Sequence, residues 1–167
     1  MRTVWCAAIA ALMLLTSPAA HPQAVLPDRG GATGLRQSVF GLGLAAGMVS
    51  GIGLSFRHHL PSVFSYQITG GIVKPGDKLS YAIGAEVQFD LVRSPSTRFF
   101  VAGGAGYYYS GTSSHNDVEG PGRFGAGVGG EIAIGGGFHV SGELMFSYFT
   151  DGSVLPLPQA GIHYYFY

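Results

Sequence analysis

The segment FGAGVGGEIAIGGGFHVSGELMFSY, residues 124–148, carries the pattern that decides the fold. On both sides of the glycines at 135–137, apolar or glycine positions alternate with small or polar ones. A period of two is that of a β-strand, whose successive side chains point to opposite faces of a sheet. The segment therefore predicts two antiparallel strands joined by a short turn.

The same alternation continues through the chain from Gln37 onward. Eight strands are predicted, over residues 40–46, 52–56, 64–68, 81–89, 99–107, 124–134, 138–148 and 160–166. Between the first two, a tight turn near residues 48–50 is preferred to one long strand. A membrane-crossing strand needs only about 9–11 residues, and single-chain bacterial barrels have even strand numbers. The longest loop is expected over residues 110–122.

The composition excludes several classes of protein. Charged residues make up 11% of the chain and hydrophobic residues 47%, whereas soluble domains contain about 25% charged residues. The chain has 28 glycines, and beyond its first residues it lacks the apolar run of about 18 that a membrane helix needs. Its net charge is zero, so no nucleic-acid partner is expected.

The N-terminus predicts export. Arg2, the apolar run VWCAAIAALMLL and the small residues SPA at 17–19 are typical of a cleaved secretory signal peptide. We expect a signal peptide over residues 1–20, a flexible lead-in over 21–36 and one domain over 37–167. The single cysteine, Cys6, lies inside the signal, so no disulfide or lipid anchor is expected in the mature chain.

The two faces of the predicted strands differ in chemistry. One face is apolar and aromatic, and the other is small and polar with few charges. So few charges would not coat a soluble exterior, but they suit a narrow interior filled with hydrogen-bonded side chains. The sequence thus predicts an all-β protein, an eight-stranded antiparallel up-and-down transmembrane β-barrel. A soluble secreted β-barrel that binds a small apolar ligand is the alternative from another class.

Aromatic residues gather near the strand ends, as interfacial girdles do. With both barrel ends of the chain in the periplasm, the inner girdle contains Phe40, Phe56, Phe64, Phe89, Phe99, Phe138 and Phe166. The outer girdle contains Tyr81, Tyr107, Tyr109, Phe124 and Tyr148.

The last strand, AGIHYYFY at residues 160–167, ends on aromatic residues. With this ending, residues 37–167 resemble the small eight-stranded outer-membrane barrels of Gram-negative bacteria, the OmpA/OmpX-like group. The resemblance implies a location in the outer membrane among lipids and lipopolysaccharide, and recognition of the last strand by the barrel-assembly machinery. One departure is that Tyr167 falls by parity on the face opposite Phe166. The oligomeric state is left open.

The inward face predicts a polar cluster in the lumen. Its members are Arg57, Glu86, Glu131, His139, Glu143 and His163. A three-residue loop at 135–137 would place Glu131 opposite Ser141 and Glu143 one diagonal step away, with Arg57 as the cation between the carboxylates. A structural plug is favoured, because an eight-stranded barrel is just wide enough for its own side chains. A narrow pH-sensitive pore is the alternative.

Two enzyme-like or metal-like patterns have weaker support. The stretch HVSGE, residues 139–143, superficially resembles the His-x-Ser of outer-membrane lipid A deacylases, but its residues point inward from a periplasmic turn. The histidines His58, His59 and His115 lack matched ligands and are interpreted as solvated loop residues. We therefore expect neither catalytic residues nor a cofactor, and a structural or surface-interaction role.

Overall fold

The structure is a computed structural model, and it describes residues 38–74, 76–112 and 115–166. The predicted signal peptide, the predicted lead-in and the phase of Tyr167 lie outside the described residues. No helix in the described part of the chain is long and apolar enough to cross a membrane.

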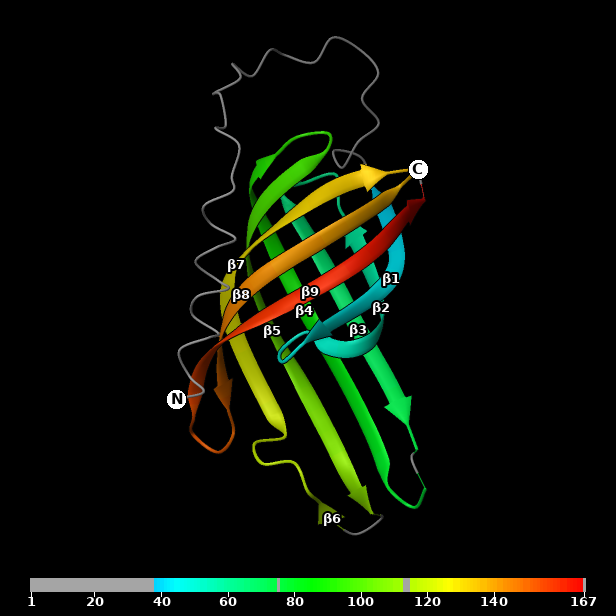
Figure 1. The fold of residues 1–167 in the computed structure, drawn as a ribbon. Helices are drawn as coiled ribbons and strands as arrows, with labels where there is room; N and C mark the ends of the chain where they lie inside the picture. The colour runs from blue at the N-terminus through cyan, green and yellow to red at the C-terminus, as the bar shows by residue number, and fades with distance from the viewer. Residues whose placement is uncertain (1–37, 75, 113–114, 167) are drawn as a thin grey trace, which may run out of the picture. The chain divides into compact units, whose positions relative to one another are not determined.

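The described residues form an antiparallel barrel (Figure 1). Its eight strands are β1 (Val39–Gly47), β2 (Gly51–His59), β3 (Phe64–Val73), β4 (Leu79–Arg93), β5 (Thr97–Thr112), β7 (Gly122–Gly135), β8 (Phe138–Phe149) and β9 (Val154–Phe166). Each strand pairs with the next one along the chain, and β1 pairs with β9 to close the ring. The predicted eight-stranded up-and-down barrel, with its tight turn at residues 48–50, is confirmed.

Two expected connections differ from the prediction. Strand β5 continues to Thr112 and pairs with a two-residue strand, β6 (His115–Asn116), so the segment expected as the loop 110–122 begins as a strand extension. At the other end, Gly135 pairs with Phe138, and a bulge precedes Gly135. The three-residue loop is therefore a two-residue turn, which the positive φ angles of Gly136 and Gly137, 58° and 83°, permit.

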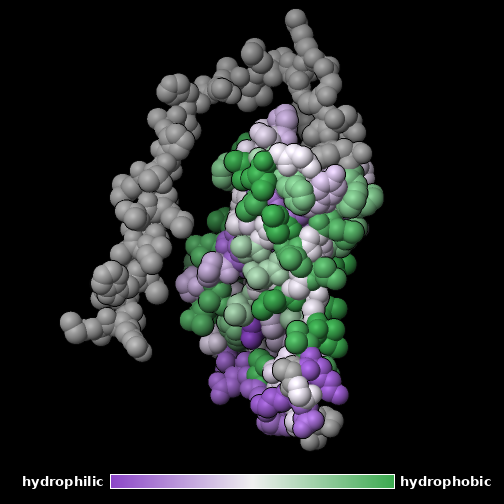
Figure 2. Space-filling view, turned by 45° about the vertical axis from the view of Figure 1, so that its right-hand side comes forward, coloured by the Kyte–Doolittle hydropathy of each residue, from purple (hydrophilic) through white to green (hydrophobic). Residues whose placement is uncertain are grey.

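The two ends of the barrel differ. We call the end at which the described chain begins and finishes the terminal end; the β2–β3, β4–β5 and β7–β8 turns also lie there. We call the opposite end the loop end; it carries the β1–β2, β3–β4 and β8–β9 turns and the β5–β7 connection. Figure 2 shows hydrophobic residues over the wall of the barrel and hydrophilic ones gathered at the loop end.

The wall is apolar outside and polar inside. Leu42, Leu144 and Ile162 are exposed on the outer face, whereas Gln67 and Gln88 are buried inside. Among the described residues, charged side chains buried in the interior are Arg57, Glu86, Asp90, Arg98, Arg123, Glu131 and Glu143. The described charged residues in the connections at the loop end are exposed: Lys74, Asp77, Lys78, Asp117, Glu119 and Asp151. This sidedness is the reverse of a soluble barrel's, and it matches a wall in lipid.

The β1–β2 hairpin is short, and its turn bends into the barrel. Val49 and Ser50 are buried, and Val49 packs in one cluster with Phe100 and Met145. The bend needs glycine on the opposite wall, because a Cβ at Gly125 would lie 2.7 Å from Val49 Cγ2. The turn therefore fills the lumen on the loop-end side of the charged residues.

Candidate functional site: a buried charge network in the lumen

Glu131 on β7 is the centre of the charge network. Its Oε2 lies 2.5 Å from Arg57 Nη1 of β2 and 2.8 Å from Arg98 Nη2 of β5. The other carboxylate oxygen, Oε1, lies 3.1 Å from His139 Nδ1. None of these four side chains exceeds 2% exposure. One carboxylate thus joins two guanidinium groups from different strands across the lumen.

The two arginines have further acceptors. Arg57 donates through Nε to Gln67 Oε1 at 2.7 Å, and its Nη2 lies 3.5 Å from Glu143 Oε1. Arg98 donates to Asp90 Oδ1 at 2.9 Å and to Gln88 Oε1 at 2.6 Å. Burying a charge is costly unless it is paired and hydrogen-bonded. These acceptors meet that condition for both arginines.

A second carboxylate pair lies on the loop-end side of this centre. Gln159 Nε2 donates to Glu86 Oε2 at 3.2 Å and to Glu143 Oε2 at 3.1 Å. The Oε1 of the same amide accepts from the backbone N–H groups of Val49 and Ser50, at 2.9 and 3.0 Å. Gln159 therefore connects the carboxylates to the inward β1–β2 turn, so the charge network and the hairpin form one continuous filling.

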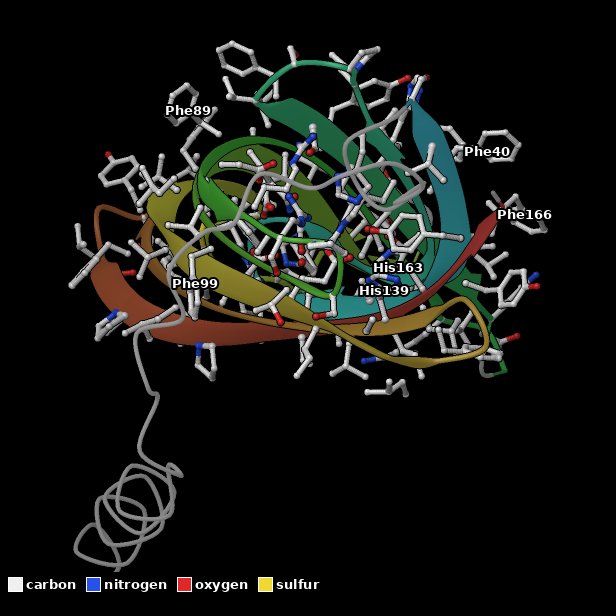
Figure 3. All side chains as sticks on the ribbon, turned by 90° about the horizontal axis from the view of Figure 1, so that it is seen from above. Phe40, Phe89, Phe99, His139, His163 and Phe166 are labelled. Atoms are coloured by element: carbon white, nitrogen blue, oxygen red, sulfur yellow. The ribbon has the colours of Figure 1, made fainter. Side chains whose placement is uncertain are left out.

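Three histidines of the described chain also lie in the interior. His163 Nε2 lies 2.9 Å from Ser55 Oγ. His59 lies with Nδ1 2.8 Å from Ser65 Oγ and Nε2 2.7 Å from the Tyr165 hydroxyl. The His139 ring packs edge-on against Tyr165 at 4.6 Å. Figure 3, seen along the barrel, shows His139 and His163 pointing inward, and Phe40, Phe89 and Phe166 pointing away from the lumen.

The structure brings the six residues of the predicted lumen cluster together inside the barrel, with Arg57 between Glu131 and Glu143. Glu131 pairs with Ser141, as the predicted register requires. The residues assigned to girdles lie on the outer face, where aromatic neighbours touch. Phe40 packs on Phe166 at 5.4 Å and Tyr81 on Tyr109 at 5.1 Å.

The interpretation of His58 and His59 as solvated loop residues is wrong. Both belong to β2, and strand parity sends His59 into the lumen while His58 packs against Tyr66 on the outer face. His115 is exposed, as expected. In the described part of the chain, no group of three or more His, Cys, Asp or Glu residues is placed to hold a metal ion.

Sequence reasoning missed Asp90, Arg98 and Tyr165, all of which belong to the network. A signal for each was present, because each neighbours an aromatic or apolar residue that faces outward. Phe99 outward implies Arg98 inward, and Phe166 outward implies Tyr165 inward.

The deacylase-like stretch lies inside the same network. Ser141 is 3% exposed, and its Oγ accepts from Arg57 Nη2 at 3.3 Å. Glu143 takes part in the carboxylate pair with Glu86. A lipid in the surrounding bilayer does not meet these side chains, because they face the filled lumen and not the wall.

The fold and its sidedness define a small transmembrane β-barrel. No protein-family profile and no curated protein matches the sequence. Among solved structures, the backbone structure of the Yersinia pestis outer membrane protein Ail in a phospholipid bilayer nanodisc is similar. The match has a TM-score of 0.44 and 15% identity, and covers 77% of this chain and 98% of that one. At this identity the likeness carries no residue roles across.

Proposed function

We propose that this protein is an integral outer-membrane barrel with a closed lumen and a structural or surface-interaction role, without enzymatic activity. The observation that carries the proposal is the filling of the lumen. Arg57, Arg98 and Glu131 are at most 2% exposed and connect strands from opposite sides of the barrel. The β1–β2 turn packs on their loop-end side. A lumen filled in this way supports a plug better than a channel.

The orientation belongs to the same proposal. The exposed charges of the connections, such as Lys78 and Asp117, gather at the loop end, and outer-membrane barrels keep short turns in the periplasm and longer loops outside. We place the loop end outside the cell, where outer-leaflet lipopolysaccharide and other surface molecules meet it. The last strand, β9, is the segment offered to the barrel-assembly machinery.

A narrow pH-sensitive pore is the second candidate. Its support is that His139 and His59 approach Glu131 Oε1, at 3.1 and 3.9 Å. Ionisable groups that face inward at membrane depth are often functional, and histidine is the side chain whose ordinary charge change falls nearest neutral pH.

Conductance across a planar lipid bilayer distinguishes the two. The refolded full-length protein is measured at several pH values beside the double variant Glu131→Gln, Glu143→Gln, with Lys78→Gln as a charge-removing control outside the lumen. The plug predicts no steady current from the native protein at any pH. Current steps from the native protein that change with pH and with the double variant, but not with Lys78→Gln, would refute the plug and support the pore.

A further inference from the structure

The barrel wall is incomplete on one side of its loop end. The last pair between β1 and β9 is Ala46 with Ala160, and the last pair between β2 and β3 is Leu54 with Gly70. Beyond them, residues 154–159 of β9 and 72–73 of β3 have no strand paired on their facing edges in the described part of the chain. Figure 1 shows the β1–β2 turn ending midway while β4 and β5 continue to the loop end.

The free edge of β9 lacks most of its hydrogen-bond donors. The Tyr165 N–H donates to Gly137 O on the β8 side, and the β8–β9 register is unbroken as far as Val154. Odd-numbered amides of β9 therefore face β8, and even-numbered ones face the free edge. Two of those even positions are Pro156 and Pro158, which have no N–H. Such an edge resists pairing with another strand, because its prolines have no N–H to donate.

A groove of about 860 Å³, within the size range of ligand sites, lies on the β3 side of the opening, and its lining includes Ile72 and Val73 of β3 but no described residue of β9. Its outer side is apolar and includes Ile52, Leu54, Ile72 and Ile83, which are exposed on the outer wall. Its inner side is more polar and includes Ser80, Ser110 and Arg123. The groove thus opens toward the lipid and becomes polar toward the lumen.

Arg123 lies at the polar side and forms no salt bridge with a described residue. It is 8% exposed and lines the groove, and Asp151 is an acidic neighbour that interacts with it at longer range than a salt bridge. Its hydrogen bonds go to Gly120 O at 3.4 Å and to the Met48 sulfur at 2.8 Å, and its guanidinium lies 3.9 Å from the Tyr108 ring centroid. Arg57 and Arg98, by contrast, each meet carboxylates.

The contrast with the lumen arginines indicates an anionic ligand. A guanidinium has five N–H donors, and phosphate is a strong acceptor for them. A thioether is a weak acceptor, so Arg123 retains the capacity to bind an anion without losing a strong internal bond. The apolar side of the groove accommodates a hydrocarbon chain in continuity with the bilayer.

We propose that this groove binds one molecule of an anionic phospholipid, which enters sideways from the surrounding bilayer through the gap between β3 and β9. Its acyl chain lies along Ile52, Leu54 and Ile72, and its phosphate pairs with Arg123. The proposal assigns the protein a specific lipid partner in addition to its place in the membrane. It rests on the proposed location in the outer membrane, and the heat-dependent gel shift described below checks folding of the barrel separately from lipid binding.

Native mass spectrometry of the detergent-solubilised full-length protein tests the proposal. The protein is titrated with palmitoyl-oleoyl phosphatidylglycerol and with the neutral diacylglycerol of the same chains. The native protein is expected to retain one phosphatidylglycerol and to bind it about tenfold more tightly than Arg123→Gln does, in keeping with loss of one charge-assisted contact. Diacylglycerol should bind equally to both proteins.

Two further variants control for charge and for folding. Lys78→Gln removes a positive charge at the same end, where Lys78 is exposed and paired with Asp117 at 3.2 Å, and it should leave lipid affinity within twofold. Ala82→Phe fills the groove and should reduce retention of both lipids, whereas Ala126→Phe on the outer face should not. Each variant must show the heat-dependent gel shift of a folded barrel.

The proposal is overturned if the native protein and Arg123→Gln bind phosphatidylglycerol alike, or if Lys78→Gln and Arg123→Gln lose affinity equally. It is also overturned if Ala82→Phe has no effect, or if the mass spectra show a dimer that excludes lipid. A variant that fails the gel-shift check leaves the other variant to decide, since Arg123→Gln and Ala82→Phe alter different parts of the groove.

Discussion

Replacing Glu131 with glutamine should destabilise the barrel far more than replacing any other lumen carboxylate. The change keeps the shape of the side chain and removes the charge that lies 2.5 Å from Arg57 and 2.8 Å from Arg98. Among the described residues, Arg98 then retains Asp90 at 2.9 Å, whereas the remaining acidic partner of Arg57 is Glu143 at 3.5 Å. The variant therefore leaves a buried guanidinium with one weak ionic contact.

The magnitude follows from the burial of the group. Removing one partner of a buried ion pair costs about 3–5 kcal/mol, because the remaining charge is desolvated and uncompensated. Glu143→Gln is the matched control. Glu143 has its ionic contact at 3.5 Å and otherwise accepts from the amides of Gln88 and Gln159, at 3.4 and 3.1 Å. Its loss should cost about 1 kcal/mol, as for an ordinary hydrogen bond.

Equilibrium urea unfolding of the protein refolded into lipid vesicles measures both values. We expect the free energy of unfolding to fall several-fold more for Glu131→Gln than for Glu143→Gln, with an unchanged denaturant slope. Equal losses for the two variants, or a loss below about 1 kcal/mol for Glu131→Gln, would show that Glu131 does not hold the network together.

Two other predictions concern the inward hairpin and the loop end. A Cβ at Gly106 would overlap the Val49 carbonyl oxygen, whereas one at Gly142 meets nothing within 4 Å. Gly106→Ala should therefore speed hydrogen exchange of the Val49 amide, and Gly142→Ala should not. Equal exchange rates of this amide in the two variants would contradict the buried turn. The hydrogen bond from the Ser153 N–H holds the pKa of Asp151 below its usual range. The ionised carboxylate therefore stabilises the turn at any pH above the ordinary aspartate pKa of about 3.9. That stabilisation is lost as the pH falls through the lower pKa of the folded protein. An NMR titration should give a depressed Asp151 pKa, and an ordinary value would refute the contribution of this bond.

Much of the barrel follows from local pattern. The alternation that sends Leu144 outward and Glu143 inward is a property of each strand alone, and the turn residues fix the number of strands. For the same reason the pairing of Glu131 with Ser141 followed from the sequence even though the turn was one residue shorter, since a bulge at β7 restored the register.

The parts that sequence reasoning missed depend on distant contacts. The Met48–Ser50 region has no signal that its turn bends inward, because the bend requires glycines on β4, β5 and β7 and the amide of Gln159 on β9. The misplacement of His59 had a different cause. Its strand was expected to end before His58, with both histidines on the turn that follows, so the inward parity of His59 was not applied. The groove at Arg123 arises from unequal strand lengths around the ring, which no single strand reveals.

A nitroxide scan along β8 tests most directly whether the apolar wall of this barrel lies in lipid. Cys6, the single cysteine, lies in the expected signal peptide, so Cys6→Ser is needed only where that segment is retained, and one label at a time is placed between Phe138 and Phe149 in the protein refolded into bilayers. The rate at which the nitroxide collides with dissolved oxygen should alternate with a period of two, high at outward positions such as Leu144 and low at inward ones such as Ser141. A further label, placed at Asp151 in the exposed β8–β9 turn, should instead collide with a water-soluble nickel complex. A scan without this alternation, or with nickel access at Leu144, would contradict a transmembrane barrel with a filled lumen.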